Sequence, residues 1–424
     1  MNMNNLLPTG VLVTLALLPA YLLRMSFFGI PTTLLEIMLL VLIILWLIQN
    51  RKRLKELFAI KRSWAIFIAL VIIATTISAI IAPDTLSAFG IWKAYFIEPI
   101  LFFYLLVDLL KRKQITNEHV LIALCVGGLL VAVTAILQWI LWAGIPIPWD
   151  VERRVTGLFD YPNALGLFLG PLTIISLSVI MRKYLLSTPV EEVLVSRRRE
   201  QRRQSDGPET WHQRFFFVCS ILFLLAIILA QSEAALASVI VTVIIMGITH
   251  SKFRKPTIII SCMALLILFS IPTTRVFITN KISLQDYSGQ VRLSQWKETI
   301  ELLKDHPIVG AGLSQYPNAL KPYHKDTQFE IFQYPHNIFL NIWVELGLLG
   351  LLTFFYLISL VLQTSRPSWS SGPSWPLLLF FPLLQIFIHG LVDVPYFKND
   401  LAVLIWTLLA LFYVAKISSK SEKQ

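Results

Sequence analysis

Long uninterrupted apolar runs constrain this chain more than any other feature of its sequence. Runs of 18 or more residues recur along the whole length, and each is long enough to cross about 30 Å of hydrocarbon as a helix. Charged residues make up 14% of the chain and the mean hydropathy is +0.70, whereas an average soluble domain has about 25% charged residues. The alternating ten-residue segments of a membrane barrel are not found. The sequence therefore predicts an all-α polytopic membrane protein.

We predict about twelve transmembrane helices, the first of them retained because no signal-peptide cleavage site follows it. Residues 1–273 hold helices one to nine, residues 274–336 form a loop subdomain, and residues 337–424 hold the last three helices and a tail. The predicted helices span approximately 6–23, 31–49, 63–82, 91–110, 118–142, 162–181, 214–231, 234–250, 257–273, 337–363, 375–392 and 400–415.

Basic residues concentrate in alternate loops, and membrane proteins keep such loops in the cytoplasm. Both termini are then predicted to be cytoplasmic, and loops 143–161 and 274–336 to face outward. Topology also accounts for the net charge of +11, so no nucleic-acid partner is predicted. The run RRREQRR at 197–203 is either an anionic-lipid patch or a topology determinant. The basic segments are 50–62, 111–117, 182–213, 251–256 and the tail.

The outward loop 274–336 has an organisation of its own. Trp296, Ile300 and Leu303 recur at helical spacing, which predicts an amphipathic helix over about 288–305. Pro307 and two following glycines end that helix, and a second short helix is predicted to begin near Pro317. We expect one outer-face helical subdomain that rests on the membrane before the tenth span.

A five-residue repeat links this loop to an earlier segment. The sequence YPNAL occurs at 161–165 and again at 316–320, and a shorter relative, YPHN, occupies 334–337. One interpretation is coincidence, because proline suits the first turn of any helix. The other interpretation is a shared phosphate-binding role. The predicted helices after Pro162 and Pro335 both run inward from the outer face, so their N-termini lie at that face and would favour phosphate.

Arginine and histidine side chains are the main candidates for chemistry. Arg153 and Arg154 are cations on an outward loop, and a guanidinium fork suits phosphate oxygens; the alternative is headgroup snorkelling. Arg292 begins the amphipathic helix and alone would be a solvated side chain. His336 stands where the outer loop enters the membrane and is either a general base or a helix-end cap.

Other polar groups are weaker candidates. His306 and His324 lie in the same outer loop as His336. Glu345 lies nine residues past His336, about 13 Å deeper and on the opposite helix face, so we expect a buried structural role. Ionisable groups within spans are functional candidates by default, and the others of this kind are Lys93, Glu98, His389 and Asp393.

No metal or cofactor site is predicted. Outward loops contain no DxD, HExxH or CxxC pattern, and the three cysteines all fall in apolar runs. The chain also has no P-loop and no dinucleotide fingerprint. The energy for any reaction is then expected to reside in an activated donor substrate.

Four ordered blocks together carry a family resemblance. The pattern His336-Asn337, nine residues, Gly347, two residues, Gly350 resembles the motif of the O-antigen ligase and O-antigen polymerase superfamily of bacterial membrane glycosyltransferases. The resemblance covers nearly the whole chain, with 160–400 as the approximate ligase-like region. The other matching positions are Arg292, Trp296, Pro307, Gly310 and Gly312; Arg154, Gly157, Pro162 and Asn163; and HGLVD at 389–393.

The resemblance implies a GT-C-type fold in the bacterial inner membrane. It implies an undecaprenyl-pyrophosphate-linked glycan as donor and a glycan or lipid A core as acceptor. It further implies His336 as the base and Arg154 and Arg292 as pyrophosphate ligands, with Arg153 as the alternative to Arg154. Supporting roles fall to Asn337, Trp296, Gly347, Gly350, Asn163 and Asp393.

Three rivals stay open. A protein O-oligosaccharyltransferase branch of the same family would transfer to Ser or Thr. A lipid-glycan flippase or transporter would more often show inverted repeats and broken midplane helices. A noncatalytic assembly partner would make His336 replaceable.

Overall fold

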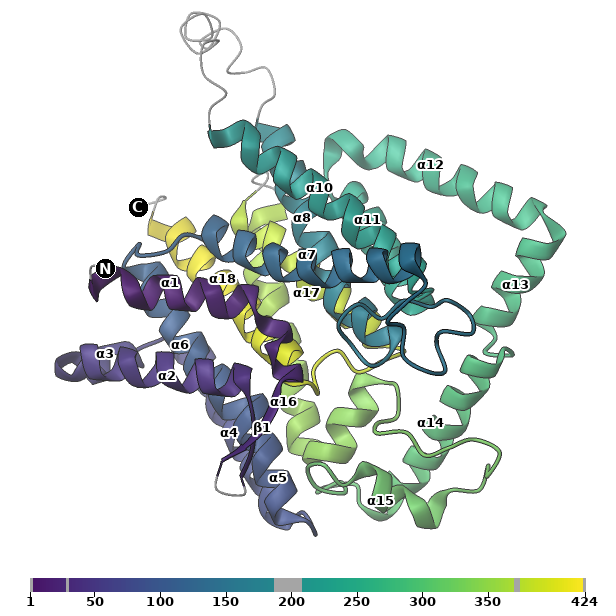
Figure 1. Cartoon of the computed structure of the whole chain (residues 1–424), viewed down its shortest axis with the longest axis horizontal. Helices are drawn as coiled ribbons and strands as arrows, with labels where there is room; N and C mark the ends of the chain where they lie inside the picture. The colour runs from purple at the N-terminus through teal and green to yellow at the C-terminus, as the bar shows by residue number, and fades with distance from the viewer. Residues whose placement is uncertain (1–2, 28–29, 187–207, 370–373, 422–424) are drawn as a thin grey trace, which may run out of the picture.

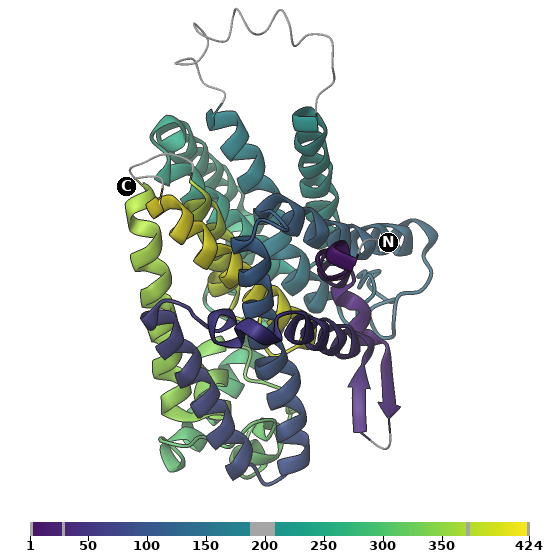
Figure 2. The same cartoon turned by 90° about the vertical axis from the view of Figure 1, so that its left-hand side faces the viewer.

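The computed structural model describes residues 3–27, 30–186, 208–369 and 374–421, so the run at 197–203 lies outside it. The described chain is almost entirely helical, as predicted (Figure 1). It also contains one antiparallel hairpin, formed by β1 (Arg24–Phe27) and β2 (Ile30–Thr33), which projects from the helices in Figure 2. The hairpin was not predicted, because a four-residue strand is too short to show an alternating pattern.

Seven helices of the described chain are long and apolar enough to cross a membrane. An eighth span arises if α2 (Leu34–Gln49) is joined across a 72° bend to the short helices η2 (Arg51–Arg53) and α3 (Leu54–Leu57). The seven are α4 (Arg62–Ile81), α7 (Asn117–Leu141), α8 (Pro162–Leu186), α10 (Pro208–Leu229), α12 (Ser251–Ser270), α16 (Ile338–Trp369) and α18 (Asn399–Ser421).

The remaining predicted spans also correspond to helices. The span at 91–110 is a π-helix, η3 (Trp92–Ile97), that continues into α6 (Glu98–Lys111) after the short α5 (Thr85–Ile91). The first span is shorter than predicted because a 3₁₀ turn, η1 (Leu18–Leu22), follows α1. The count of twelve spans therefore stays a prediction. Three apolar helices are shorter than a full span: α1 (Met3–Ala16), α11 (Glu233–Thr249) and α17 (Trp375–His389).

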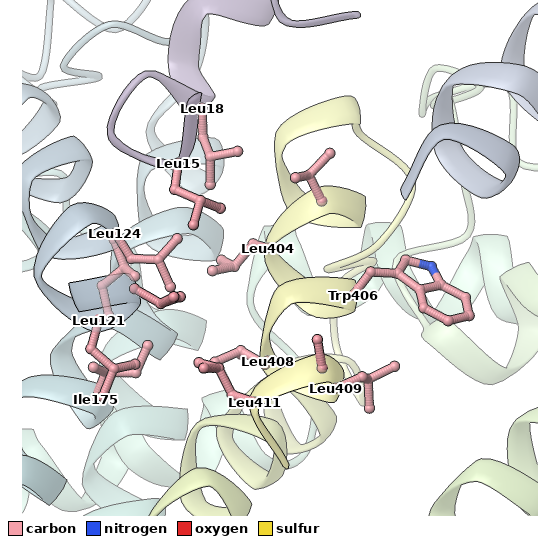
Figure 3. Close-up of a cluster of buried hydrophobic side chains, with 14 of the residues drawn as sticks. Leu15, Leu18, Leu121, Leu124, Ile175, Leu404, Trp406, Leu408, Leu409 and Leu411 are labelled. Carbon is pink, nitrogen blue, oxygen red and sulfur yellow. The ribbon is translucent and has the colours of Figure 1, made fainter. Parts of the chain in front are cut away.

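The packed centre of the molecule surrounds α18. One face of this helix directs Leu404, Leu408 and Leu411 toward α7 and α8, while Trp406 and Leu409 point to the opposite side (Figure 3). The Trp406 ring packs 5.9 Å from Phe67 of α4 between ring centroids. Because α18 is apolar on both sides, it is enclosed by other helices instead of lining the surface.

Helix α12 lies apart from this centre (Figure 1). None of its residues is buried, although the helix is apolar. It continues through α13 (Pro272–Ile282) to the outer loop. A helix that is apolar around its circumference and packs on little protein is suited to contact with lipid.

Two of the basic loops meet at one carboxylate. Asp108 accepts hydrogen bonds from Arg53 at 2.8 Å and from the Trp46 indole at 3.0 Å, and the Arg112 guanidinium lies 3.7 Å away. Loops 50–62 and 111–117 are thus adjacent, and their position on the cytoplasmic side stays a prediction.

The outer loop forms α14 (Tyr287–Asp305), α15 (Tyr316–Leu320) and η4 (Lys321–Tyr323), which agree with the two predicted helices. Its small apolar core joins α14 and α15 to Val344 of α16. Glu298 accepts hydrogen bonds from the amides of Lys325 and Asp326 and contacts His324 at 3.0 Å. His324 therefore holds this loop together.

Candidate active site

The site is built around His336, which lies two residues before the start of α16. Its Nδ1 lies 3.4 Å from Oδ1 of Asp393, and its ring packs between Phe332 and Tyr334. The backbone of His336 is left-handed, with φ of +50°, a conformation costly for a residue with a Cβ. The side chain keeps 17% of its surface exposed, while that of Asp393 keeps 3%.

Asp393 provides a buried negative charge for this histidine. Burial raises the pKa of Asp393, but the hydrogen bond and charge of His336 outweigh burial and hold the pKa below its ordinary value. The amide of Val394 also donates to Oδ1 at 2.8 Å. The carboxylate is therefore ionised at neutral pH and can fix the orientation of the ring.

Asn337 holds together the two segments that carry His336 and Asp393, which are 57 positions apart in the chain. Its Oδ1 accepts from the amides of Phe339 and Leu340, which caps the first turn of α16. Its Nδ2 donates to the carbonyl of Leu391 at 3.0 Å. One side chain thus starts the helix and holds the segment that carries Asp393.

Two side chains of α14 brace both halves of the pair. Arg292 donates from Nε to the Val392 carbonyl at 2.9 Å, and Trp296 donates from Nε1 to the Pro335 carbonyl at 2.9 Å. Each accepting carbonyl belongs to the residue next to His336 or Asp393. The structure therefore brings together five predicted site residues: Arg292, Trp296, His336, Asn337 and Asp393.

Gly347 breaks α16 where the outer loop docks. Its φ of 68° and ψ of −174° are not helical. The backbone amide of the next residue, Leu348, donates to the Ile308 carbonyl at 2.9 Å. The Val344 carbonyl, which would accept from Leu348 in a regular helix, accepts instead from Ala311 at 2.7 Å. The break exchanges one bond within the helix for two bonds to the loop.

The arginine pair lies in a separate place. The Arg153 guanidinium is held between the rings of Trp139 and Trp142, at 4.3 and 4.4 Å. Arg154 donates to the carbonyls of Ala230 and Gln231 at 3.3 and 3.4 Å. Burial lowers the pKa of Arg154, although an arginine stays charged. Within the described ranges, no contact joins either arginine to His336 or Asp393.

The first and third copies of the repeat meet at the site. The hydroxyls of Tyr161 and Tyr334 lie 3.0 Å apart, and Tyr334 contacts the His336 ring. The middle copy behaves differently, because Tyr316 bonds Thr299 inside the outer subdomain. Asn163 lies in the first turn of α8 and makes no side-chain hydrogen bond within the described chain.

Two cavities lie near His336, and each is lined by a residue two positions away from it in the chain. An apolar cavity of about 380 Å³ lies among α4, α16, α17 and α18 and is lined by Ile338 and Gly350. A larger polar cavity of about 980 Å³ is lined by Tyr334 and Tyr161. The other polar residues of its wall come from loops predicted to face outward and from predicted spans, and they include Arg24, Glu36, Asp84, Lys93, Asp160, Asn341, Glu345, Lys398 and Asn399.

Lys398 is a site residue that the motif search missed. Its ammonium lies 4.8 Å from the Phe159 ring and 5.2 Å from the Tyr161 ring. Burial lowers its pKa, against the opposing charges of Asp400 and Asp160. The signal was available, because Lys398, like the arginine pair, is a cation on a segment predicted to face outward.

Among the described residues, no three His, Cys, Asp or Glu side chains are grouped so that they could hold a metal ion. Metal independence stays a prediction. Glu345 is buried, and its carboxylate accepts from the Ser314 amide, in keeping with the structural role expected for it.

Comparison with known families adds an independent observation. Residues 218–355 match the family model described as O-antigen ligase. The matched segment covers about a third of the chain and supports the predicted resemblance to the O-antigen ligase superfamily. Together with the helices long enough to cross a membrane, it supports an integral membrane protein of polysaccharide biosynthesis. The match includes Arg292, Trp296, His336 and both motif glycines, and lies within the predicted region 160–400. No curated protein matches the chain.

Proposed function

We propose that this protein is a glycosyltransferase of the bacterial inner membrane. It moves a saccharide from undecaprenyl pyrophosphate to an acceptor hydroxyl at the outer face, without a metal ion and with inversion. The supporting observation is the His336–Asp393 pair, with an apolar cavity lined by Ile338 and a polar cavity lined by Tyr334 nearby.

His336 acts as the general base in this proposal. Because Nδ1 faces Asp393, Nε2 is free to take the proton of the acceptor hydroxyl. The acceptor oxygen forms the bond to the anomeric carbon, and the bond from that carbon to pyrophosphate breaks with its electron pair. Asp393 stabilises the imidazolium and holds the ring in place. One displacement inverts the anomeric carbon.

The arginines balance the charge of the leaving pyrophosphate. Arg292 is braced beside the catalytic pair, and we propose it as the first ligand and Arg154 as the second. Arg153 is the weaker candidate because two indole rings enclose it. The polyprenyl chain would lie in the apolar cavity, whose lining is aliphatic and aromatic. Removing one such electrostatic donor typically costs about 10²–10³ in rate.

The test is transfer by purified protein from undecaprenyl-pyrophosphate-linked saccharide in excess EDTA. Lipid A core and a second lipid-linked repeat are offered as separate acceptors. We expect product on one of them and a loss of about 10²–10⁴-fold in His336→Ala. His306→Ala is the matched control, since His306 is an exposed outer-loop histidine. Full turnover in His336→Ala would refute the catalytic assignment.

One observation favours the rival transport function. Helix α16 is broken, as transporter helices often are, but its freed backbone groups bond the outer loop. Leaflet distribution in a knockout separates the two functions. Lipid-linked glycan that accumulates on the outer leaflet supports transfer, and accumulation on the inner leaflet supports transport.

A further inference from the structure

The polar cavity beside Tyr334 has no role in the mechanism above. It has a volume of about 980 Å³, which is large enough for a ligand of several rings. Its wall combines aromatic rings, Tyr21, Tyr95 and Phe397, with carboxylate and amide side chains. Flat apolar rings and planar hydrogen-bonding groups suit a saccharide, which presents apolar C–H faces and a rim of hydroxyls.

Asn341 places an unpartnered amide at the wall of this cavity. This side chain is 1% exposed and lines the cavity, yet neither its Nδ2 nor its Oδ1 has a hydrogen-bond partner in the described chain. Buried amides are nearly always satisfied by protein, water or ligand. An amide offers a donor and an acceptor together, which matches a sugar hydroxyl that needs both.

The charges of the cavity disfavour the pyrophosphate as its occupant. The wall carries four carboxylates and three cations. The carboxylates are those of Glu36, Asp84, Asp160 and Glu345. One of those cations, Lys93, already pairs with Glu36 at 2.6 Å. The net charge of the wall is therefore negative, which is unfavourable for a multiply charged anion but does not affect the binding of a neutral sugar.

The position of the cavity distinguishes acceptor from donor. Displacement with inversion requires the attacking oxygen and the leaving pyrophosphate on opposite sides of the anomeric carbon. Arg292 contacts the Asp393 segment, whereas the cavity begins at Tyr334, which contacts the other partner, His336. We propose that the polar cavity is the acceptor site and binds the saccharide end whose hydroxyl His336 deprotonates. This inference rests on the proposed glycosyl transfer.

Two substitutions test the site without disturbing its frame. Gly90 lies on the cavity wall in α5, and a Cβ built there meets no atom within 4 Å. Gly90→Trp therefore places a large side chain where open space exists. Asn341→Ala removes the two unpartnered polar atoms, which leaves or improves fold stability. Asn318→Trp is the control, because Asn318 is exposed on α15 outside the cavity wall.

The first measurement is equilibrium binding of two deacylated probes, lipid A core oligosaccharide and the released repeat oligosaccharide. We expect wild type and Asn318→Trp to bind one probe, Asn341→Ala to bind it about three- to tenfold more weakly, and Gly90→Trp not to bind it. Undecaprenyl pyrophosphate should bind all four proteins alike. In turnover, the acceptor KM should rise while the donor KM stays constant.

The outcomes separate the two proposals. Probe binding without turnover in wild type would reject the proposed transfer and keep a saccharide cavity. Turnover in which Gly90→Trp raises the donor KM instead of the acceptor KM would assign the cavity to the donor glycan and reject this inference. Unchanged probe binding in both cavity variants would also reject it.

Discussion

Replacing Gly347 with alanine tests whether the broken helix joins the outer loop to the membrane helices. Gly347 has φ of +68° and ψ of −174°, a region that only glycine adopts freely. A Cβ there would overlap the Ile308 carbonyl oxygen and lie 3.0 Å from the Val309 carbonyl carbon. The substitution therefore meets both backbone strain and a collision with main-chain atoms, which cannot rotate away.

The magnitude follows from these two terms. The disfavoured backbone costs about 1–3 kcal/mol and the overpacking about 1–3 kcal/mol more. The chain can escape by continuing the helix, which alanine favours. Leu348 would then donate to Val344, and the two bonds to Ile308 and Ala311 would be lost. We expect the free energy of unfolding to fall by about 2–6 kcal/mol if the loop stays docked, and turnover to fall if it leaves.

Gly144→Ala is the matched control. Gly144 also has positive φ, +74°, but a Cβ there meets no atom within 4 Å, so it measures backbone strain alone. Unfolding free energies come from SDS titration in mixed micelles, and limited proteolysis of loop 274–336 reports docking. If Gly347→Ala loses no more stability than Gly144→Ala and keeps the loop protected, the proposed role of the break is wrong.

The remaining predictions concern charge at the site. Asp393→Asn keeps the shape of the side chain but removes the charge opposite the His336 imidazolium, so the rate constant should fall at least about tenfold while donor KM changes little; an unchanged rate would mean that Asp393 only packs. Arg292→Ala should lower turnover by about 10²–10³, whereas Arg153→Ala, whose guanidinium is stacked between indoles, should mainly lower thermal stability. The reverse order of the two arginine effects would reassign the pyrophosphate ligand.

Periodicity and local motifs could predict much of this protein. The amphipathic helix at 288–305 and the helix start after Asn337 depend on residues three or four positions apart, so one stretch of sequence contains the whole cause. The same holds for the charge rule, which flagged Arg153 and Arg154 as cations on a loop predicted to face outward. The short strands β1 and β2 escaped because four residues leave too little pattern.

The sequence by itself determined the membrane class and the helices, because both depend on local composition and spacing, and its family resemblance named the candidate site residues. The tertiary structure alone decided that Asp393 faces His336, that Arg292 braces the pair, and that Arg153 is enclosed by indoles. It also decided the exchange of hydrogen bonds at Gly347 and the unpartnered Asn341 in a polar cavity. These features depend on packing between segments distant in the chain, and no local pattern encodes which distant carbonyl or ring a side chain will meet.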